Sequence, residues 1–294
     1  MNAAIFAPGF FASQIVAVAV TVSAIAAITC ASVGVFTVIR SQSFAGEALG
    51  DISATGGSGA YLVGAGLLWG FGVAAVAAVA VMELIGIQRP RGRDLATGIV
   101  LGAGLGLAAL FLYLDTISNS TTGATVTVAF GTMFALTSSA IAPVAGLSAL
   151  ALCLVGVLGR PLLLSSVSPE LAAARGIPVR LVGAGYLLAL ALAVALAAYT
   201  IGAILATALL VGPAATALRL TRSPGRAVLL ASMIGILAAW LGILLAYDSY
   251  TWPPAGQGWP VSFFIVTLIL VGYVLAGVAQ RLRHRRLASE RSRG

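Results

Sequence analysis

The sequence predicts an all-α membrane protein, a polytopic bundle of about eight or nine transmembrane helices. Of its 294 residues, 60% are hydrophobic and only 8% are charged, and the mean hydropathy is +1.09. So few polar side chains cannot cover the surface of a water-soluble domain. The apolar runs are long and continuous, without the period-two alternation of an outer-membrane barrel, and this pattern favours helical spans.

The expected spans follow one another as apolar runs that short polar or basic segments separate. The second run is less apolar than the rest, and its glycines predict close packing against neighbouring helices (Gly56, Gly57, Gly59 and Gly64). Residues 126–136 are too short to cross a bilayer and are predicted to be re-entrant or interfacial, so eight spans plus this segment fit nearly as well as nine. The expected spans cover about residues 11–39, 47–66, 67–87, 95–114, 141–158, 181–198, 201–218, 227–246 and 261–278.

The net charge of +8 comes entirely from arginine, since the chain has no lysine. The arginines lie in short clusters between alternate apolar runs, which favours a membrane and not a nucleic acid as the partner. The positive-inside rule then places the N-terminus outside, and it places residues 281–294 inside as a basic tail after the transmembrane domain 1–280. No basic segment precedes the first span, so it is not interpreted as a signal peptide. Cys30 and Cys153 lie in apolar runs and are predicted to be buried thiols.

Two carboxylates, Glu47 and Asp51, lie four residues apart in a chain with only eight acidic residues. On a helix, residues at this spacing share a face, and two like charges there repel unless a cation, a proton or water lies nearby. A carboxylate pair within or beside the membrane indicates an ion pathway. The alternative is that both side chains solvate a loop at headgroup level, and the spacing alone leaves the two interpretations open.

A short polar helix is predicted on the cytoplasmic side, between the fifth and sixth spans. Ser168 and Pro169 have the residue types of an N-cap and a first helical position, and Glu170 suits the positive end of the helix dipole. Gly176 is placed to end the helix, and Pro178 prevents its continuation. The segment is either an ordinary capped linker or a docking helix for a cytoplasmic partner such as a motor subunit.

A proline lies deep in the seventh expected span. Pro213 follows Gly212, removes one backbone hydrogen bond and is expected to bend the helix. Such breaks are tolerated where a helix packs in protein or lines a water-filled cavity. Thr207 and Thr216 are expected to bond to the carbonyl groups that the proline frees. A packing kink is the simpler interpretation of this break.

These stretches resemble the membrane subunits of ABC importers for divalent metal ions, from about residue 40 to residue 246. The family pattern R-x-x-S-x-x-G-D-A-x-S-H-A is similar to a run that comprises Arg40, Ser43, Gly46, Glu47, Ala48, Gly50, Asp51 and Ile52. The pattern D/E-x-A-x-A-x-G-x-P corresponds to Pro169, Glu170, Ala172, Ala174, Gly176 and Pro178. The pattern V-G-x-x-L-x-x-A-x-L-x-x-P-A-A-T-A corresponds to Ile201, Gly202, Leu205, Ala208, Leu210, Pro213, Ala214, Ala215, Thr216 and Ala217. A weaker F-G-N element corresponds to Phe130, Gly131 and Thr132.

The resemblance implies a homodimeric permease in a bacterial cytoplasmic membrane, with two cytoplasmic ATPase subunits and an external substrate-binding lipoprotein. It implies that the ATPase docks on residues 168–178, and that Gly202, Pro213 and Thr216 form a helix break in the pathway. In the family an Asp and a His, four residues apart, bind the ion in transit. Glu47 and Asp51 occupy these positions here, and two carboxylates favour manganese or iron(II) over zinc.

The chain itself is not expected to be an enzyme. It contains no Gly-x-x-x-x-Gly-Lys-Ser/Thr loop, so ATP hydrolysis is assigned to a partner chain. No permanent cofactor is expected, because the divalent metal ion is the transported substrate. The alternative function is a secondary transporter that is driven by an ion gradient and uses Glu47 and Asp51 as a proton relay. An ATPase gene beside this one would favour the ABC importer.

Overall fold

The computed structural model describes residues 13–85, 93–119, 123–131, 133–221, 223–252 and 258–291. These residues form α-helices and short 3₁₀ helices, without a strand, as the sequence predicts. In chain order the α-helices are α1 (Gln14–Ile39), α2 (Ser43–Leu62), α3 (Leu67–Ile85), α4 (Arg93–Asn119), α5 (Gly123–Phe130), α6 (Ile141–Val167), α7 (Pro169–Ala174), α8 (Val179–Ile201), α9 (Ala206–Leu220), α10 (Pro224–Asp248) and α11 (Val261–Arg291). The 3₁₀ helices are η2 (Met133–Ala135), η3 (Ser138–Ala140) and η4 (Ser249–Thr251).

Among the described residues, seven helices are long and apolar enough to cross a membrane, namely α1, α3, α4, α6, α8, α10 and α11. The two remaining expected spans are also helices. Helix α2 has 20 residues and carries the two carboxylates, and helix α9 is a shorter apolar helix of 15 residues. The predicted short segment, residues 126–136, covers the second half of α5, which has only eight residues, and the 3₁₀ helix η2. The multi-pass helical bundle is therefore confirmed.

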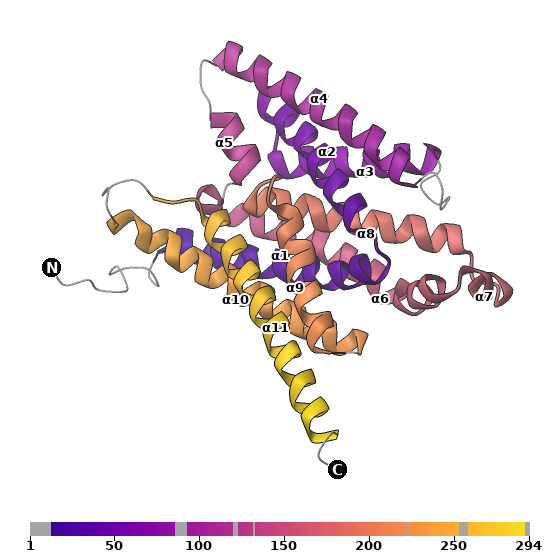
Figure 1. The fold of residues 1–294 in the computed structure, drawn as a ribbon. Coiled ribbons are helices and arrows are strands. Elements are labelled where there is room, and N and C mark those ends of the chain that lie inside the picture. The colour runs from indigo at the N-terminus through magenta and orange to yellow at the C-terminus, as the bar shows by residue number, and fades with distance from the viewer. Residues whose placement is uncertain are drawn as a thin grey trace.

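Helices α1 and α8 form the centre of the bundle (Figure 1). They are its most buried long helices, with alanine and valine prevailing in α1 and alanine and leucine in α8. Helices α2, α3 and α4 pack together on one side of α8, while α9, α10 and α11 pack together beside α1 (Figure 1). Helix α6 contacts both central helices, and α7 lies at the edge of the bundle (Figure 1).

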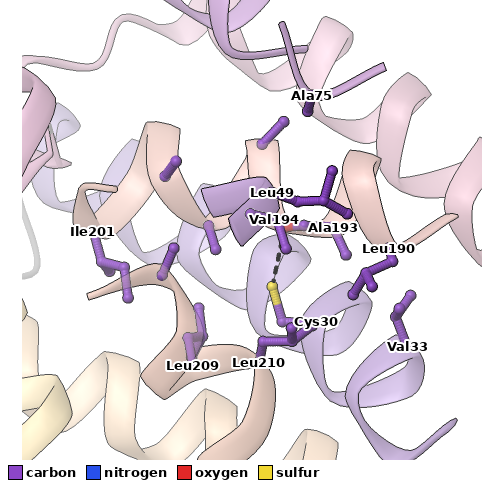
Figure 2. Packing of buried hydrophobic residues seen from close by; sticks show 14 of the residues in the cluster. Cys30, Val33, Leu49, Ala75, Leu190, Ala193, Val194, Ile201, Leu209 and Leu210 are labelled. Carbon is purple, nitrogen blue, oxygen red and sulfur yellow. Dashed lines mark hydrogen bonds between the residues drawn. The ribbon is translucent and has the colours of Figure 1, made fainter. Parts of the chain in front are cut away.

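The core around Cys30 shows how closely α1 and α8 approach each other. The Cys30 thiol donates to the Ala193 carbonyl of α8 at 3.3 Å, among Leu190, Val194 and Leu210 (Figure 2). The prediction of a buried thiol is confirmed for Cys30. It is wrong for Cys153, which is exposed on the surface of α6, because the bilayer and not the protein interior covers an apolar side chain on an outer helix face.

The glycines of α2 pack closely against neighbouring helices, as predicted. A Cβ on Gly56 would lie 2.0 Å from the carbonyl oxygen of Gly70 in α3, and one on Gly57 would lie 2.5 Å from the Phe71 ring. A Cβ on Gly59 would meet the Phe111 ring of α4 at 3.3 Å. Gly64 differs, because it has open space around it and a φ of +67° just after the helix ends. Its role is the left-handed turn and not packing.

Several helices end further along the chain than predicted, among them α6 and α8. Helix α6 continues past Arg160 and Pro161 to Val167, and its last turns contact Arg40 at the end of α1. Helix α8 continues past the expected turn at residues 199–200, and the Thr200 hydroxyl donates to carbonyl groups within the helix. Helix α8 ends at Ile201, and α9 begins at Ala206.

Several predictions concern residues that the structure does not describe, or describes in part. The start of the first span, most of the basic cluster at 88–94 and Thr132 of the F-G-N element lie outside the described residues. Helix α11 runs across residue 280, the predicted limit between the transmembrane domain and the basic tail. This division of the chain stays a prediction.

Candidate ion pathway and coupling helix

The two predicted ion ligands lie on one face of α2. Glu47 is exposed, and Asp51, one turn further along, is half-buried. At 100° per residue, Ala54 and Ser58 continue the same face of the helix. The carboxylates thus form the first two turns of a stripe of small and polar side chains that runs along α2.

The adjacent face of α2 is held tightly against α8 and α9. A Cβ on Gly46 would lie 2.9 Å from the Leu210 side chain, and one on Gly50 would lie 3.4 Å from Val194. The same position on Gly50 lies 3.8 Å from the Ala203 carbonyl oxygen and 3.9 Å from the Thr207 hydroxyl. Glycine lets the helices approach closely here, so that Asp51 is held beside the start of α9.

The pair is not a complete metal site within one chain. Across the part of the chain that the structure describes, no group of three or more His, Cys, Asp or Glu side chains could hold a metal ion. A hard divalent ion takes about six ligands, so two carboxylates must be supplemented by water or by a second protein chain.

A contact that the sequence did not predict lies at the junction of α8 and α9. Gly202 ends α8 with a φ of +92°, and Gly131, just after α5, has a φ of +81°. The two glycines meet backbone to backbone. A Cβ on Gly202 would lie 2.1 Å from the Ala129 carbonyl oxygen, and the Ala203 N–H donates to the Val128 carbonyl at 3.0 Å.

This Gly131–Gly202 crossing joins two elements of the family pattern whose glycines are 71 residues apart in the sequence. The F-G element is a weak match by sequence, and the close approach of Gly131 to Gly202 explains its glycine. One glycine in each of the two elements is the signal in the sequence, but pairing the two glycines requires the fold. Neither site can take a side chain without displacing backbone.

Helix α9 continues through Pro213, and the bend expected there stays a prediction. Pro213 lies buried within Ala206–Leu220, and the interruption is the non-helical stretch between Gly202 and Ala206. Thr216 donates to the Gly212 carbonyl at 2.8 Å. The carbonyl that Pro213 frees is that of Leu209, four residues earlier, so Thr216 does not have the predicted partner. Thr207 points towards α2 instead.

The predicted capped helix is confirmed as α7, Pro169–Ala174. The Ser168 hydroxyl accepts a hydrogen bond from the Leu171 N–H at 3.3 Å, and Glu170 lies in the first turn. Gly176 has a φ of +76°, and the Ile177 N–H donates to the Ala172 carbonyl at 3.0 Å, which closes the C-terminal end. Ala172 faces the bundle, while Glu170, Leu171, Ala174 and Pro178 are exposed.

A multi-pass helical bundle with these features is the membrane permease of an ABC transporter. The chain belongs to the ABC 3 transport family, whose model matches residues 12–276. It is the non-catalytic membrane subunit, and ATP is hydrolysed by a separate subunit. This assignment supports the ATP-driven prediction and removes the basis for the gradient-driven alternative.

Two curated relatives and one solved structure are similar along most of the chain. The manganese transport system membrane protein MntC of Halalkalibacterium halodurans is 29% identical over 78% of this chain and 78% of its own length. The manganese import system permease protein ScaB of Streptococcus parasanguinis is 29% identical over 75% of this chain and 78% of its own length. The structure of PsaBC from Streptococcus pneumoniae in complex with Fab superposes with a TM-score of 0.77 at 24% identity, covering 91% of this chain and 92% of that one.

Proposed function

We propose that this permease imports a divalent metal ion and that manganese is its preferred substrate. The observation that carries the proposal is the pair Glu47 and Asp51, two carboxylates on one partly open face of α2. Hard oxygen ligands suit manganese and iron(II) better than they suit zinc. The names of the relatives, which are manganese transport proteins, support the same substrate.

The working unit in this proposal is a homodimer, with α2 of each protomer facing a central path. Two copies would place four carboxylates around one ion, and their oxygens with water complete a shell of about six ligands. Four carboxylates without a cation repel one another. The site is therefore a transient one, occupied while the ion passes.

The ATPase dimer docks on α7 in this proposal, and a substrate-binding lipoprotein delivers the ion from outside. The exposed surface of the capped helix supports the docking role, since a short helix fixed at both ends presents a rigid surface to a partner. The arginine pattern supports an external N-terminus and a cytoplasmic C-terminus. Cysteines at Arg175 and Tyr250, in a chain lacking Cys30 and Cys153, test this orientation, with Arg175→Cys labelled only from the cytoplasm and Tyr250→Cys only from outside.

The substrate is tested by metal uptake into vesicles that contain the permease, the ATPase and the lipoprotein. Glu47→Gln and Asp51→Asn should each abolish manganese uptake, while the ATPase still copurifies with the permease. Uptake by the wild type should fall at acidic pH, because protons compete with the ion for the carboxylates. Asp51→His should shift the preference towards zinc, for which imidazole is a better ligand.

The matched control is Asp248→Asn at the C-terminal end of α10, where the carboxylate accepts a hydrogen bond from the Trp252 indole N–H at 3.3 Å. An amide oxygen can accept the same bond, so uptake should be unchanged. If Glu47→Gln and Asp51→Asn transport manganese as well as the wild type does, the carboxylates only solvate the helix and the proposed site is wrong.

A further inference from the structure

Arg40, at the end of α1, contacts three other elements through its guanidinium group. Its Nε donates to the Gln42 amide oxygen at 3.4 Å. One terminal nitrogen donates to the hydroxyl groups of Ser165 at 3.0 Å and Ser166 at 3.3 Å, and lies 3.5 Å from the Leu162 carbonyl oxygen. The bond to Ser165 has an ordinary length, and the other contacts are longer. Arg40 thus connects the α1–α2 turn with the last turn of α6.

The same guanidinium group stacks on helix α8. Its central carbon lies 5.2 Å from the centre of the Tyr186 ring, within the range of a cation–π contact. Tyr186 is fully buried, and its hydroxyl donates to Thr37 of α1 at 2.8 Å. A planar, five-donor cation can stack and bond at its edge simultaneously, which lysine cannot do. Contacts with α1 and α8 therefore fix the orientation of the Arg40 guanidinium group that bonds to α6.

The two segments that Arg40 joins lead to the two functional parts of the molecule. Ser165 and Ser166 lie three and two residues before Ser168, the N-cap of the exposed helix α7. Gln42 is the N-cap residue of α2, five positions before Glu47. Ser41, which lies between Arg40 and Gln42, has a φ of +53°. The chain therefore turns sharply here, and the direction of α2 depends on this turn.

We propose that Arg40 is a positioning residue that transmits movement of α7 to the carboxylate-bearing helix α2. This inference rests on the proposed docking of the ATPase on α7. When the ATPase moves α7, the last turn of α6 moves with it, because only Ser168 separates the two helices. The guanidinium group holds that turn at a set distance from Gln42, so the start of α2 moves as well.

An alternative role for Arg40 is to anchor the end of α1 and nothing more. An anchor would lower thermal stability and transport together. A positioning residue would lower the amount of metal transported per ATP hydrolysed while the complex stays assembled and stable. The ratio of uptake to ATP hydrolysis therefore separates the two roles.

The experiment uses the full transporter, with ATPase and lipoprotein, in proteoliposomes supplied with Mn²⁺. Arg40→Lys keeps the charge but loses the planar group, and Ser165→Ala with Ser166→Ala removes the acceptors on α6. Both variants should copurify with the ATPase, hydrolyse ATP at about the wild-type rate, and transport about tenfold less metal per ATP, the size of a typical coupling between sites. Because the serine variant changes only two small side chains, it tests the inference even if Arg40→Lys folds poorly.

Combining the substitutions tests whether they interrupt one connection. The variant with all three substitutions should lose no more uptake per ATP than Arg40→Lys alone, since residues in one network are not additive. Arg219→Lys is the matched control. Arg219 also stacks on a tyrosine, with its central carbon 3.8 Å from the Tyr273 ring, but it connects α9 with α11 and not with α6. Its uptake per ATP should equal that of the wild type.

Wild-type uptake per ATP in Arg40→Lys and in the serine variant would overturn the inference, and so would losses that multiply in the combined variant. An equal loss in Arg219→Lys would overturn it too. Failure of the docking proposal is measured separately, by Glu170→Arg. If that charge reversal leaves ATPase binding and uptake intact, α7 is not the docking helix, whatever the Arg40 variants do.

Discussion

The segments on either side of helix α8 differ physically, since one is exposed and the other is buried. Before α8, the chain forms the exposed helix α7, which is closed by a serine hydroxyl at one end and by Gly176 at the other. After α8, it forms the buried Gly131–Gly202 crossing, in which two backbones touch and an amide bonds directly to a carbonyl of another segment. Both interruptions place glycine at positive φ, but only the second surrounds it with backbone.

The difference shows what each interruption can do. In a lipid-surrounded bundle, a non-helical segment must satisfy its backbone groups within the protein, and the crossing does so with the Ala203 N–H. The two backbones lie so close together that neither Gly131 nor Gly202 has room for a side chain. The segment around α7 satisfies its backbone N–H and C=O groups locally. Its outer surface is therefore available to a partner, and a substitution there is expected to leave the fold intact.

The largest effect is expected at the buried end. Gly202→Ala would place a methyl group 2.1 Å from the Ala129 carbonyl oxygen at a φ of +92°, which adds backbone strain to overpacking. We expect destabilisation of about 3 kcal/mol or more, seen as lost yield and a lower thermal midpoint in detergent.

Gly176→Ala is the matched control for this substitution. Its φ of +76° is in the same region, but no atom lies within 4 Å of the added methyl group. Only backbone strain is expected to destabilise this variant, by about 1–2 kcal/mol. Equal losses of stability in the two alanine variants would show that the crossing is no more constrained than the exposed turn.

A smaller effect on stability, but a large one on transport, is expected at the exposed end. Glu170→Arg reverses a charge in the first turn of α7, where a basic side chain is also unfavourable to the helix dipole. We expect the affinity for the ATPase to fall by about tenfold or more, which corresponds to about 1.4 kcal/mol of binding free energy, and uptake to fall with it. ATPase copurification and vesicle uptake measure this effect.

Glu170→Gln is the control that keeps the shape of the side chain. It removes the charge without reversing it, so it should retain more ATPase binding than Glu170→Arg does. A normal thermal midpoint in both variants separates failed docking from failed folding. Normal uptake by Glu170→Arg would contradict the comparison, because α7 would then be a linker.

The smallest effect is expected from the helix cap itself. Ser168→Ala removes the bond to the Leu171 N–H, whose length of 3.3 Å indicates a weak bond. The local stability of α7 should fall by about 0.5–1 kcal/mol. Hydrogen exchange at the amides of α7 should accelerate accordingly, while exchange in α8 stays unchanged. An unchanged rate at Leu171 would show that Pro169 alone sets the start of the helix.

Elements with a local cause could be predicted from the sequence. Long apolar runs require helices, because backbone groups in lipid must bond within their own segment. Ser168, Pro169, Gly176 and Pro178 carry the start and stop signals of α7 in their own chemistry. The shared face of Glu47 and Asp51 also follows from their spacing alone, once that stretch is helical.

Features with a distant cause were decided only by the tertiary structure. Helix α6 passes Pro161 and ends at Val167, where Arg40 of another helix contacts its last turn. Helix α8 ends at Ile201, where its cap residue Gly202 meets Gly131, 71 residues earlier in the sequence. A local pattern specifies which conformations a residue tolerates. Which one is adopted depends on the backbone or side chain that the fold brings beside it.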